Sequence, residues 1–391
     1  MDLTIQPGKL RGEIQIIPSK SQAHRLLICA AFADAPTELR CPETNQDIEA
    51  TADCLRSLGA DISRTETGYC VIPNHGIPGQ AVLNCRESGS TLRFMLPVAG
   101  ALGVDATFQM AGRLPQRPLS PLWEEMERMG CTLTRPTADT IRCQGKLRPG
   151  TYRIDGSVSS QFITGLLLAL SLLDEESQLE ITGNIESKPY IDMTKQAMAL
   201  FGADPEYPGR LPFRSPGTLT VEGDWSNGAF WLAAKALGNP VTVNGLDPAS
   251  AQGDRTVAGW LSQLCSGHPT VSAKDIPDLV PILAVTAAAN HGAVFTDIRR
   301  LRLKESDRVA STIAMIEALG GKAEAGEHEL TVHGTGLHGG TVDAENDHRI
   351  AMATAIAATV CNEPVTILGA QCVQKSYPRF WEEYRRLGGK L

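Results

Sequence analysis

A strongly apolar helix-forming segment recurs six times along this chain of 391 residues. The copies are spaced by about 70 residues, with one shorter interval before the fifth, and begin at Ser21, Ser90, Ser159, Ser226, Pro277 and Asp347. Each copy is followed by a short turn and a β-rich segment, for example PVTVNGL (240–246). Two or three such matches could arise by chance, but six predict a fold built from repeats of one unit.

A second, less apolar helical segment alternates with the first. Each copy ends in a turn that contains a glycine, at Gly59, Gly130, Gly202, Gly267, Gly320 and Gly388. Glycine just after a helix is typical of a left-handed C-cap, and the β-rich residues that follow indicate a strand. The difference in apolarity predicts that each unit has one buried helix and one half-exposed helix.

Six α/β units in a chain of this length predict a pseudo-symmetric α/β protein with two domains of three units each. The chain is too long for one ordinary core, which also favours two domains. The segment VEGDWSNGAF (221–230) begins the fourth unit and is the best candidate for a crossing between the domains.

Composition limits the classes of function. The chain is 42% hydrophobic and 20% charged, as in soluble globular proteins, and its formal net charge of −8 argues against a broad nucleic-acid-binding surface. No signal peptide, transit peptide or long apolar run is evident, so we expect a cytoplasmic protein without a membrane anchor. The ten cysteines form no CxxC pair or Cys/His cluster, which argues against a metal site and against a disulfide framework.

Cationic and hydroxyl side chains gather where the apolar helices begin. A helix N-terminus disfavours cations, but an anion bound there would resolve the conflict. A single Ser or Thr at such a position is more simply an N-cap. Taken together, these helix starts predict an anion-binding surface. The residues are Lys20, Ser21, His24 and Arg25 in the first unit, Glu87, Ser88, Gly89, Ser90, Thr91 and Arg93 in the second, Ser159, Ser160 and Gln161 in the third, Asp278 in the fifth, and Asp347, His348 and Arg349 in the sixth.

Three further segments fit this surface. LPQRP holds Arg117 between two prolines, LRLKESDR carries Lys304, Glu305 and Arg308, and QKSYPRF carries Lys375. Charged residues in the last two segments are equally consistent with an exposed helix start and an exposed lysine. Arginine and lysine suit phosphate and carboxylate groups. Carboxylates at Asp278 and Glu305 would repel such a ligand, so they are either counter-ions or an acid/base pair.

Other common catalytic motifs are absent from the sequence. It contains no GxxxxGK[ST] loop, no GxGxxG after a strand and no GxSxG elbow, and its histidines lack metal-ligand spacing. Nucleotide-binding loops and the serine hydrolase elbow are therefore not predicted.

Nine segments in order resemble the 5-enolpyruvylshikimate-3-phosphate synthase family: PSKSQAHR, ESGSTLRFM, LPQRPLSPL, GSVSSQF, SKPYIDMT, IPDLVPILA, KESDR, NDHRIAMA and KSYPRF. The resemblance implies six βαβαββ units in a two-domain, inside-out α/β barrel. Residues 1–18 with 224–391 would form the first domain and residues 19–223 the second, with the active site in the cleft between them.

The resemblance also implies the reaction, which transfers the enolpyruvyl group of phosphoenolpyruvate to the 5-hydroxyl of shikimate 3-phosphate and releases phosphate through a tetrahedral intermediate. No metal or organic cofactor is implied. Catalysis would involve Asp278, Glu305 and Lys20. Shikimate 3-phosphate would contact Lys20, Ser21, Arg25, Ser159, Ser160, Gln161, Ser187, Asp278 and Lys304. Phosphoenolpyruvate would contact Lys20, Gly89, Arg93, Arg117, Gln161, Arg308, Arg349 and Lys375.

Two positions depart from the family pattern. Glu87 stands where an asparagine is usual, and its carboxylate would weaken phosphoenolpyruvate binding unless it points away or pairs with an arginine such as Arg86. Arg300 stands where many members carry asparagine, four residues before Lys304. Gly89 leaves room for glyphosate as a phosphoenolpyruvate mimic, so the resemblance implies glyphosate sensitivity.

Three alternative functions fit the sequence less well. UDP-N-acetylglucosamine enolpyruvyl transferase carries a reactive cysteine in the loop that corresponds to GRLPQRP, which has none here. A non-catalytic anion-binding relative gains nothing from carboxylates at Asp278 and Glu305. RNA 3′-phosphate cyclase would need a nucleotidylated histidine and a more basic surface. The partners expected are therefore the two small-molecule substrates, with no nucleic acid or membrane, and we expect a monomer.

Overall fold

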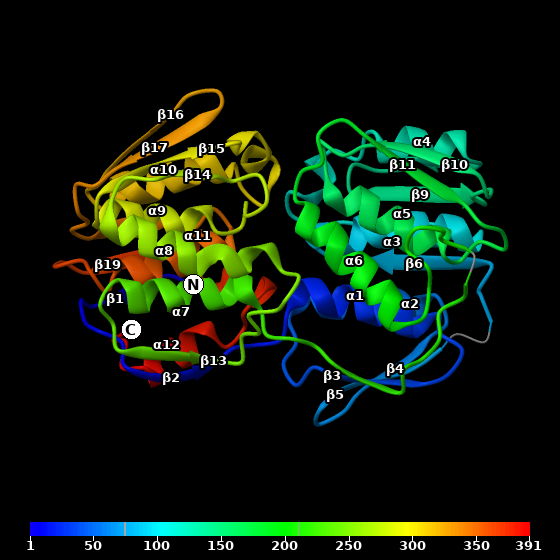
Figure 1. The fold of residues 1–391 in the computed structure, drawn as a ribbon, viewed down its shortest axis with the longest axis horizontal. Helices are drawn as coiled ribbons and strands as arrows, with labels where there is room; N and C mark the ends of the chain where they lie inside the picture. The colour runs from blue at the N-terminus through cyan, green and yellow to red at the C-terminus, as the bar shows by residue number, and fades with distance from the viewer. Residues whose placement is uncertain (74–75, 210) are drawn as a thin grey trace. The chain divides into compact units, whose positions relative to one another are not determined.

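The computed structural model describes residues 1–73, 76–209 and 211–391. The chain divides into two compact units (Figure 1). Each unit has its own hydrophobic core. Unit 1 comprises Met1–Ile17 and Gly223–Leu391, and unit 2 comprises Pro18–Glu222. These boundaries lie one residue from those expected from the sequence.

Unit 2 contains three sheets, with strand orders β12-β3-β5-β4, β6-β7-β9-β8 and β10-β11. The strands are β3 (Thr37–Arg40), β4 (Asp61–Arg64), β5 (Gly68–Ile72), β6 (Gln80–Asn84), β7 (Asp105–Gln109), β8 (Cys131–Thr134), β9 (Thr140–Gly145), β10 (Thr151–Asp155), β11 (Gln178–Thr182) and β12 (Thr218–Thr220). The helices are α1 (Lys20–Ala31), α2 (Gln46–Ser57), α3 (Gly89–Leu102), α4 (Leu122–Arg128), α5 (Ser160–Leu170) and α6 (Lys188–Leu200), with a 3₁₀ turn η1 (Leu114–Gln116).

Unit 1 also contains three sheets, with strand orders β13-β2, β14-β15-β17-β16 and β1-β19-β18. The strands are β1 (Leu3–Ile5), β2 (Gly12–Gln15), β13 (Val241–Asn244), β14 (Thr270–Ser272), β15 (Gly292–Thr296), β16 (Lys322–Ala325), β17 (Glu329–His333), β18 (Gly340–Asp343) and β19 (Val365–Leu368). The helices are α7 (Trp225–Ala236), α8 (Val257–Ser266), α9 (Val280–Ala289), α10 (Arg308–Ala318), α11 (His348–Ala357) and α12 (Phe380–Arg386), with 3₁₀ turns η2 (Gly253–Thr256), η3 (Ile298–Leu303) and η4 (Ala370–Lys375).

The second and fifth repeats show the complete unit. In the second, the strands before and after α3 in sequence, β6 and β7, pair in parallel with each other. Helix α4 then leads into the antiparallel hairpin β8–β9, and β9 pairs with β7. The fifth repeats this order with β14, α9, β15, α10 and the hairpin β16–β17. The six apolar helices are mostly buried, whereas α2, α4, α6, α8, α10 and α12 keep exposed faces, as the sequence predicts.

Segments beside the two crossings complete the sheets of each unit. Strand β2, just before the first crossing, pairs in parallel with β13, and β12, just before the return, pairs in parallel with β3. Strand β1 pairs with β19 near the other end of the chain. Strands next to the crossings and at the N-terminus therefore pair with strands of the same unit.

The short interval in the fourth repeat has a structural cause. Helix α8 ends at Ser266 and β14 begins at Thr270, so residues 267–269 replace the hairpin that follows the second helix of complete repeats. Five of the six predicted C-cap glycines have positive φ, at Gly59, Gly130, Gly202, Gly320 and Gly388. Gly267 is the C-cap of α8 as predicted, but its backbone is extended, with φ of −176°, because the chain here runs directly into the next strand.

Polar N-caps begin five of the apolar helices. The side chains of Ser19, Ser88, Ser159, Asp224 and Asp347 each accept a hydrogen bond from a backbone N–H in the first turn. Ser21 and Ser90 therefore lie inside their helices, which each begin one residue earlier than expected. Within the described residues, no helix is long and apolar enough to cross a membrane.

Candidate active site

The predicted site residues fall into two groups, one in each unit. The unit 2 site residues are Lys20, Ser21, Arg25, Gly89, Arg93, Arg117, Ser159, Ser160, Gln161 and Ser187. The unit 1 site residues are Asp278, Lys304, Glu305, Arg308, Arg349 and Lys375.

Arg25 is a buried cation held by uncharged oxygens. Its Nε donates to Thr194 Oγ1 at 2.8 Å, and Nη2 donates to the Tyr190 carbonyl at 2.9 Å and to Thr164 Oγ1 at 3.2 Å. The Ser21 carbonyl accepts from Nη1 at 2.6 Å. Burial lowers the pKa of Arg25 to about 10, which still leaves it charged at neutral pH. These contacts orient the guanidinium without cancelling its charge, so it can attract an anion.

Apart from the Ser21 carbonyl, residues on α5 and α6 supply these acceptors, and the sequence did not predict them as site residues. Thr164 and Thr194 hydrogen-bond to each other at 2.8 Å and are both fully buried. Ser187, the predicted site residue just before α6, has a left-handed backbone with φ of 54°. Such a conformation is uncommon for a residue other than glycine and is found where surrounding structure imposes it.

Gly89, Arg93, Arg117 and Gln161 lie together in unit 2. A Cβ atom on Gly89 would lie only 2.6 Å from Nη1 of Arg117 and 2.9 Å from Nη1 of Arg93. Arg93 donates to Gln161 Oε1 at 2.8 Å and to the Pro118 carbonyl at 3.1 Å, and Gln161 donates to Ser90 Oγ at 3.0 Å. The absent side chain at Gly89 therefore lets two guanidinium groups approach the start of α3, as a small anion would require.

Lys20 has a carboxylate partner that the sequence analysis did not identify. Its Nζ lies 2.8 Å from Asp47 Oδ2, in the first turn of α2. Lys20 thus differs from Arg25 in having an anionic neighbour.

Ser159 and Ser160 lie at the start of α5. Ser159 is the N-cap of this helix, since its side chain accepts from the Gln161 N–H at 3.3 Å, and Ser160 is its first residue.

Glu87, which departs from the family pattern, and the adjacent Arg86 each have an identified neighbour in unit 2. Arg86 forms an ion pair with Asp53 at 2.7 Å. The side chain of Glu87 lies against Gly112, where a Cβ atom would be 2.6 Å from Glu87 Oε2. Glu87 therefore packs on the loop that leads to Arg117.

Arg308 is the centre of the unit 1 site residues. This fully buried guanidinium contacts Asp278 Oδ1 at 2.7 Å, Glu305 Oε2 at 2.7 Å and Asp347 Oδ2 at 2.9 Å. Burial alone lowers the pKa of Arg308, but Asp347, Glu305 and Asp278 together raise it above its usual value. The structure thus brings both predicted acid/base carboxylates onto one cation.

Asp278 also contacts two further cations, Lys304 and Arg349. Lys304 Nζ lies 3.4 Å from Asp278 Oδ1, and Arg349 Nη2 lies 3.5 Å from Asp278 Oδ2. The sequence placed Asp278 at the start of its helix, but α9 begins only at Val280, after an N-cap at Leu279 that makes no side-chain hydrogen bond. Asp278 therefore does not cap the helix, and its carboxylate remains available for ion pairs.

Asp347 organises two of the predicted site arginines, Arg308 and Arg349. It is fully buried, accepts from Arg308 Nε, and caps α11 by accepting from the Arg349 N–H at 2.9 Å. The Arg349 side chain donates to the Ser226 carbonyl at 3.0 Å, and Lys375 Nζ donates to the Asn346 carbonyl at 2.8 Å. The sequence marked Asp347 only as a helix start, and its contact with Arg308 links segments 39 residues apart in sequence.

Asp254, on η2, is a second carboxyl that the sequence did not single out. Only 3% of its surface is exposed, and its Oδ1 has no hydrogen-bond partner among the described residues. Burial and then the charge of Asp278 raise the pKa of Asp254 to about 7, against smaller effects of Ser226 and Arg349. It lies within electrostatic range of the unit 1 site residues without contributing an ion pair.

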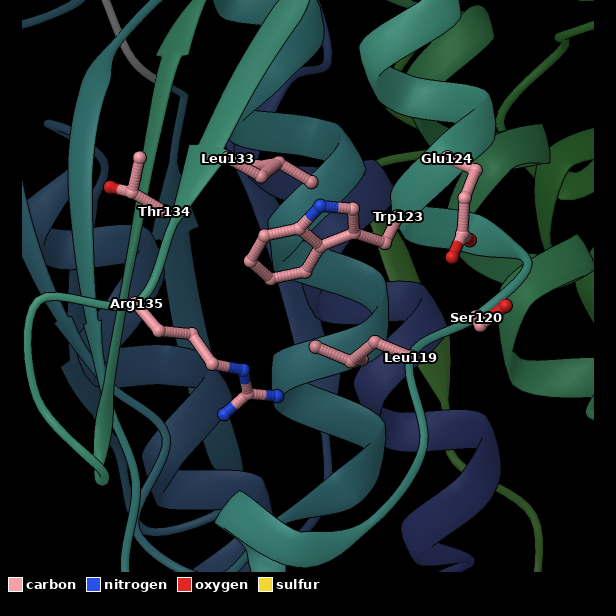
Figure 2. A pocket seen from close by; sticks show the side chains of 7 residues that line it. All are labelled: Leu119, Ser120, Trp123, Glu124, Leu133, Thr134 and Arg135. Atoms are coloured by element: carbon pink, nitrogen blue, oxygen red, sulfur yellow. The ribbon is translucent and has the colours of Figure 1, made fainter.

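A separate pocket lies on unit 2 and has a volume of about 580 Å³ (Figure 2). Its lining residues are Leu119, Ser120, Trp123, Glu124, Leu133, Thr134 and Arg135. The Arg135 guanidinium lies 5.7 Å from the centre of the Trp123 ring and donates to the Pro115 carbonyl at 3.3 Å. None of the predicted site residues lines this pocket.

Comparison with known proteins identifies the family. Residues 5–384 match the family model described as EPSP synthase (3-phosphoshikimate 1-carboxyvinyltransferase). The chain is 38% identical over 416 residues to the 3-phosphoshikimate 1-carboxyvinyltransferase of Clostridium kluyveri, covering 100% of this chain and 98% of that relative.

Two solved structures support the fold. EPSP synthase from Acinetobacter baumannii is similar with a TM-score of 0.79 at 20% identity, covering 100% of both chains. The enolpyruvyl transferase NikO from Streptomyces tendae is similar with a TM-score of 0.75 at 17% identity, covering 99% of this chain and 97% of that one. The α/β fold, the family and the enolpyruvyl transferase class predicted from the sequence are therefore confirmed. The chain belongs to the EPSP synthase (3-phosphoshikimate 1-carboxyvinyltransferase) family.

Proposed function

We propose that this protein transfers the enolpyruvyl group of phosphoenolpyruvate to the 5-hydroxyl of shikimate 3-phosphate, using the site residues described above. The observation that carries the proposal is the placement of two carboxylates, Asp278 and Glu305, on the buried cation Arg308. Proton-transfer groups and a phosphate-binding cation are thus within one hydrogen bond of each other, as the reaction requires.

The assignment of the two substrates to these site residues follows the family resemblance. Shikimate 3-phosphate contacts Lys20, Ser21, Arg25, Ser159, Ser160, Gln161, Ser187, Asp278 and Lys304. Phosphoenolpyruvate contacts Lys20, Gly89, Arg93, Arg117, Gln161, Arg308, Arg349 and Lys375. The uncharged environment of Arg25 and the close approach of Arg93 and Arg117 to Gly89 support binding of anions at these positions.

The reaction needs proton transfers both when the 5-hydroxyl adds to phosphoenolpyruvate and when phosphate is eliminated. A base removes the proton of the 5-hydroxyl as its oxygen bonds to C2 of phosphoenolpyruvate, while an acid protonates the methylene carbon. The tetrahedral intermediate then loses phosphate as a proton leaves the new methyl group. Each such transfer typically contributes about 10²–10⁴-fold to the rate.

The ion pairs favour one division of these roles. Asp278 contacts Lys304, Arg308 and Arg349, and three cations favour an ionised carboxylate that can act as the base toward the hydroxyl. The remaining role, as the acid toward the methylene carbon, then falls to Glu305, which contacts Arg308. Lys20 assists by holding phosphoenolpyruvate.

The direct test is phosphate release from phosphoenolpyruvate, measured in parallel with shikimate 3-phosphate and with UDP-N-acetylglucosamine. Release only with shikimate 3-phosphate supports the proposed acceptor. Release only with UDP-N-acetylglucosamine would replace it with the related transferase reaction. Release with neither would indicate a non-catalytic anion-binding relative.

The charge of Lys304 predicts a pH dependence of substrate affinity. Burial lowers the pKa of Lys304 to about 8, with Asp278 opposing and Arg308 reinforcing the shift. The ammonium is therefore present at pH 7 and is lost as the pH rises past 8, so the KM for shikimate 3-phosphate should be about tenfold higher at pH 9 than at pH 7. In Lys304→Arg, which stays charged, this rise should disappear. A wild-type KM that is flat between pH 7 and pH 9 would contradict the assignment.

Replacement of Gly89 by alanine should weaken phosphoenolpyruvate binding. The added methyl group would displace the guanidinium groups of Arg117 and Arg93, so we expect the KM for phosphoenolpyruvate to rise about tenfold and glyphosate inhibition to weaken by at least as much. The matched control is Gly259→Ala in α8, where a Cβ atom would meet nothing within 4 Å. Equal KM values in the two variants would show that Gly89 does not border the site.

The cellular setting follows from the same proposal. All ten cysteines are free thiols, which supports a reducing compartment such as the cytoplasm. We propose that the protein acts there as a monomer on its two small-molecule substrates. Size-exclusion chromatography with light scattering tests the monomer directly.

A further inference from the structure

His24, on α1, is a fully buried histidine with one hydrogen-bonded ring nitrogen. Its Nδ1 lies 2.7 Å from Thr51 Oγ1 on α2, and its ring meets the edge of Phe94. Its Nε2 has no hydrogen-bond partner among the described residues. Neither substrate binding nor the proton transfers described above use His24, although it lies in the same helix as Lys20 and Arg25.

The hydrogen bond from His24 continues through two threonines to the start of α3. Thr51 Oγ1 lies 2.8 Å from Thr91 Oγ1, and Thr91 Oγ1 donates to Ser88 Oγ at 2.8 Å, with the Asp47 carbonyl at 3.4 Å. Ser88 in turn caps α3, since its Oγ accepts from the Thr91 N–H at 3.2 Å. The four side chains, here called the His24–Ser88 chain, are all buried, with at most 1% of their surface exposed.

The number of available protons determines which atom is the donor in each hydrogen bond of the His24–Ser88 chain. A hydroxyl has one proton to donate, and Thr91 donates its proton toward Ser88 and the Asp47 carbonyl. Thr51 must therefore donate to Thr91, and His24 must donate to Thr51 from Nδ1–H. This leaves Nε2 unprotonated.

The His24–Ser88 chain is uncharged throughout. Burial, then the charges of Lys20 and Arg25, lower the pKa of His24 well below its usual value, so the imidazole is neutral. A carboxylate in the same place would compete with an anionic substrate for the nearby cations. A neutral chain can hold the cationic helices in position and leave their charge for the ligand.

Both ends of the His24–Ser88 chain lie beside predicted phosphoenolpyruvate contacts. At one end, α1 carries Lys20, one helical turn before His24. At the other end, Ser88 directly precedes Gly89, against which the guanidinium groups of Arg93 and Arg117 lie. Helix α2 contacts both α1 and α3. Its Thr51 is part of the His24–Ser88 chain, and its Asp47 forms the ion pair with Lys20.

We propose that the His24–Ser88 chain positions the starts of α1 and α3 so that Lys20 and the Gly89 region bind the same phosphoenolpyruvate molecule. His24, Thr51 and Thr91 are then positioning residues that act through Lys20, Arg93 and Arg117. The inference rests on the proposed function, because it assigns a role within phosphoenolpyruvate binding.

The first test is Thr51→Val, which keeps the shape of the side chain and removes the central hydroxyl. We expect the KM for phosphoenolpyruvate to rise about tenfold and the KM for shikimate 3-phosphate to rise less, because Arg25 is also held by residues of α5 and α6. The matched control is Thr286→Val on α9, because among the described residues the hydroxyl of this fully buried threonine donates to the Ile282 carbonyl of its own helix, at 3.0 Å. A KM for phosphoenolpyruvate that is unchanged in Thr51→Val, or raised equally for both substrates, would overturn the proposal, even if the melting temperature falls.

The second test compares His24→Asn with His24→Leu. Asparagine can place an amide N–H near the position of Nδ1–H, whereas leucine cannot donate, so the asparagine variant should retain a KM for phosphoenolpyruvate closer to that of the wild type. Equal KM values in two folded variants would overturn the role of the Nδ1–H donor. Wild-type activity measured first separates the two questions: an inactive wild type refutes the proposed function, whereas an active wild type with unaffected variants refutes only this inference.

Discussion

Replacement of Glu305 by glutamine is expected to lower kcat by about 10²–10⁴-fold, because glutamine cannot give a proton to the methylene carbon of phosphoenolpyruvate. The amide is nearly the same size and can still accept a hydrogen bond from Arg308, which Glu305 contacts at 2.7 Å. The KM values should therefore change much less than kcat, which is the pattern of an interaction made mainly in the transition state.

Phosphate release at saturating substrates measures this effect. The control is Glu327→Gln in the same unit, because the Glu327 side chain is 87% exposed and lies outside the site residues. The thermal transition of Glu305→Gln should remain cooperative. A kcat within threefold of the wild type would remove Glu305 from the proton transfers and leave it as a counter-ion of Arg308.

Replacement of Asp347 by asparagine is expected to destabilise unit 1 by about 3 kcal/mol and to raise the KM for phosphoenolpyruvate. Removing one partner of a buried ion pair typically costs about 3–5 kcal/mol, and we expect the lower end because Arg308 still contacts Asp278 and Glu305. The side-chain oxygen of asparagine can still cap α11, so the helix start should persist. Arg308 should then move toward Asp278 and Glu305 and bind phosphate less well.

Urea unfolding followed by tryptophan fluorescence measures this loss, since Trp225, Trp231, Trp260 and Trp381 all lie in unit 1. Glu327→Gln again serves as the exposed acid-to-amide control. An unfolding midpoint equal to that of the control would show that the ion pair between Asp347 and Arg308 does not stabilise unit 1.

The two groups of site residues handle charge differently. In unit 2, Arg25 is held by hydroxyl and carbonyl oxygens, and Arg93 by an amide and a carbonyl. In unit 1, carboxylates surround Arg308. The first arrangement keeps cationic charge available for a bound anion, whereas the second also provides groups that can exchange protons.

Much of the fold could be predicted from the sequence because its signals are local and repeated. The apolar period of each buried helix and the glycine after most of the second helices depend on residues a few positions apart. Gly267 and Asp278 show the limit. The extended backbone at Gly267 depends on the missing hairpin after α8, and the start of α9 at Val280 leaves Asp278 outside the helix.

The sequence by itself determined the six repeats and the family, and it predicted anion binding at the helix starts, because each rests on residue types at fixed positions. Only the tertiary structure decided which groups meet. Asp47 pairs with Lys20, Thr164 and Thr194 hold Arg25, and Asp347 holds Arg308. These partners come from different helices or repeats, and their contacts arise only when packing of the buried helices brings distant segments together. Hydrogen bonds and ion pairs act over a few ångströms in space, so spacing along the chain could not reveal them.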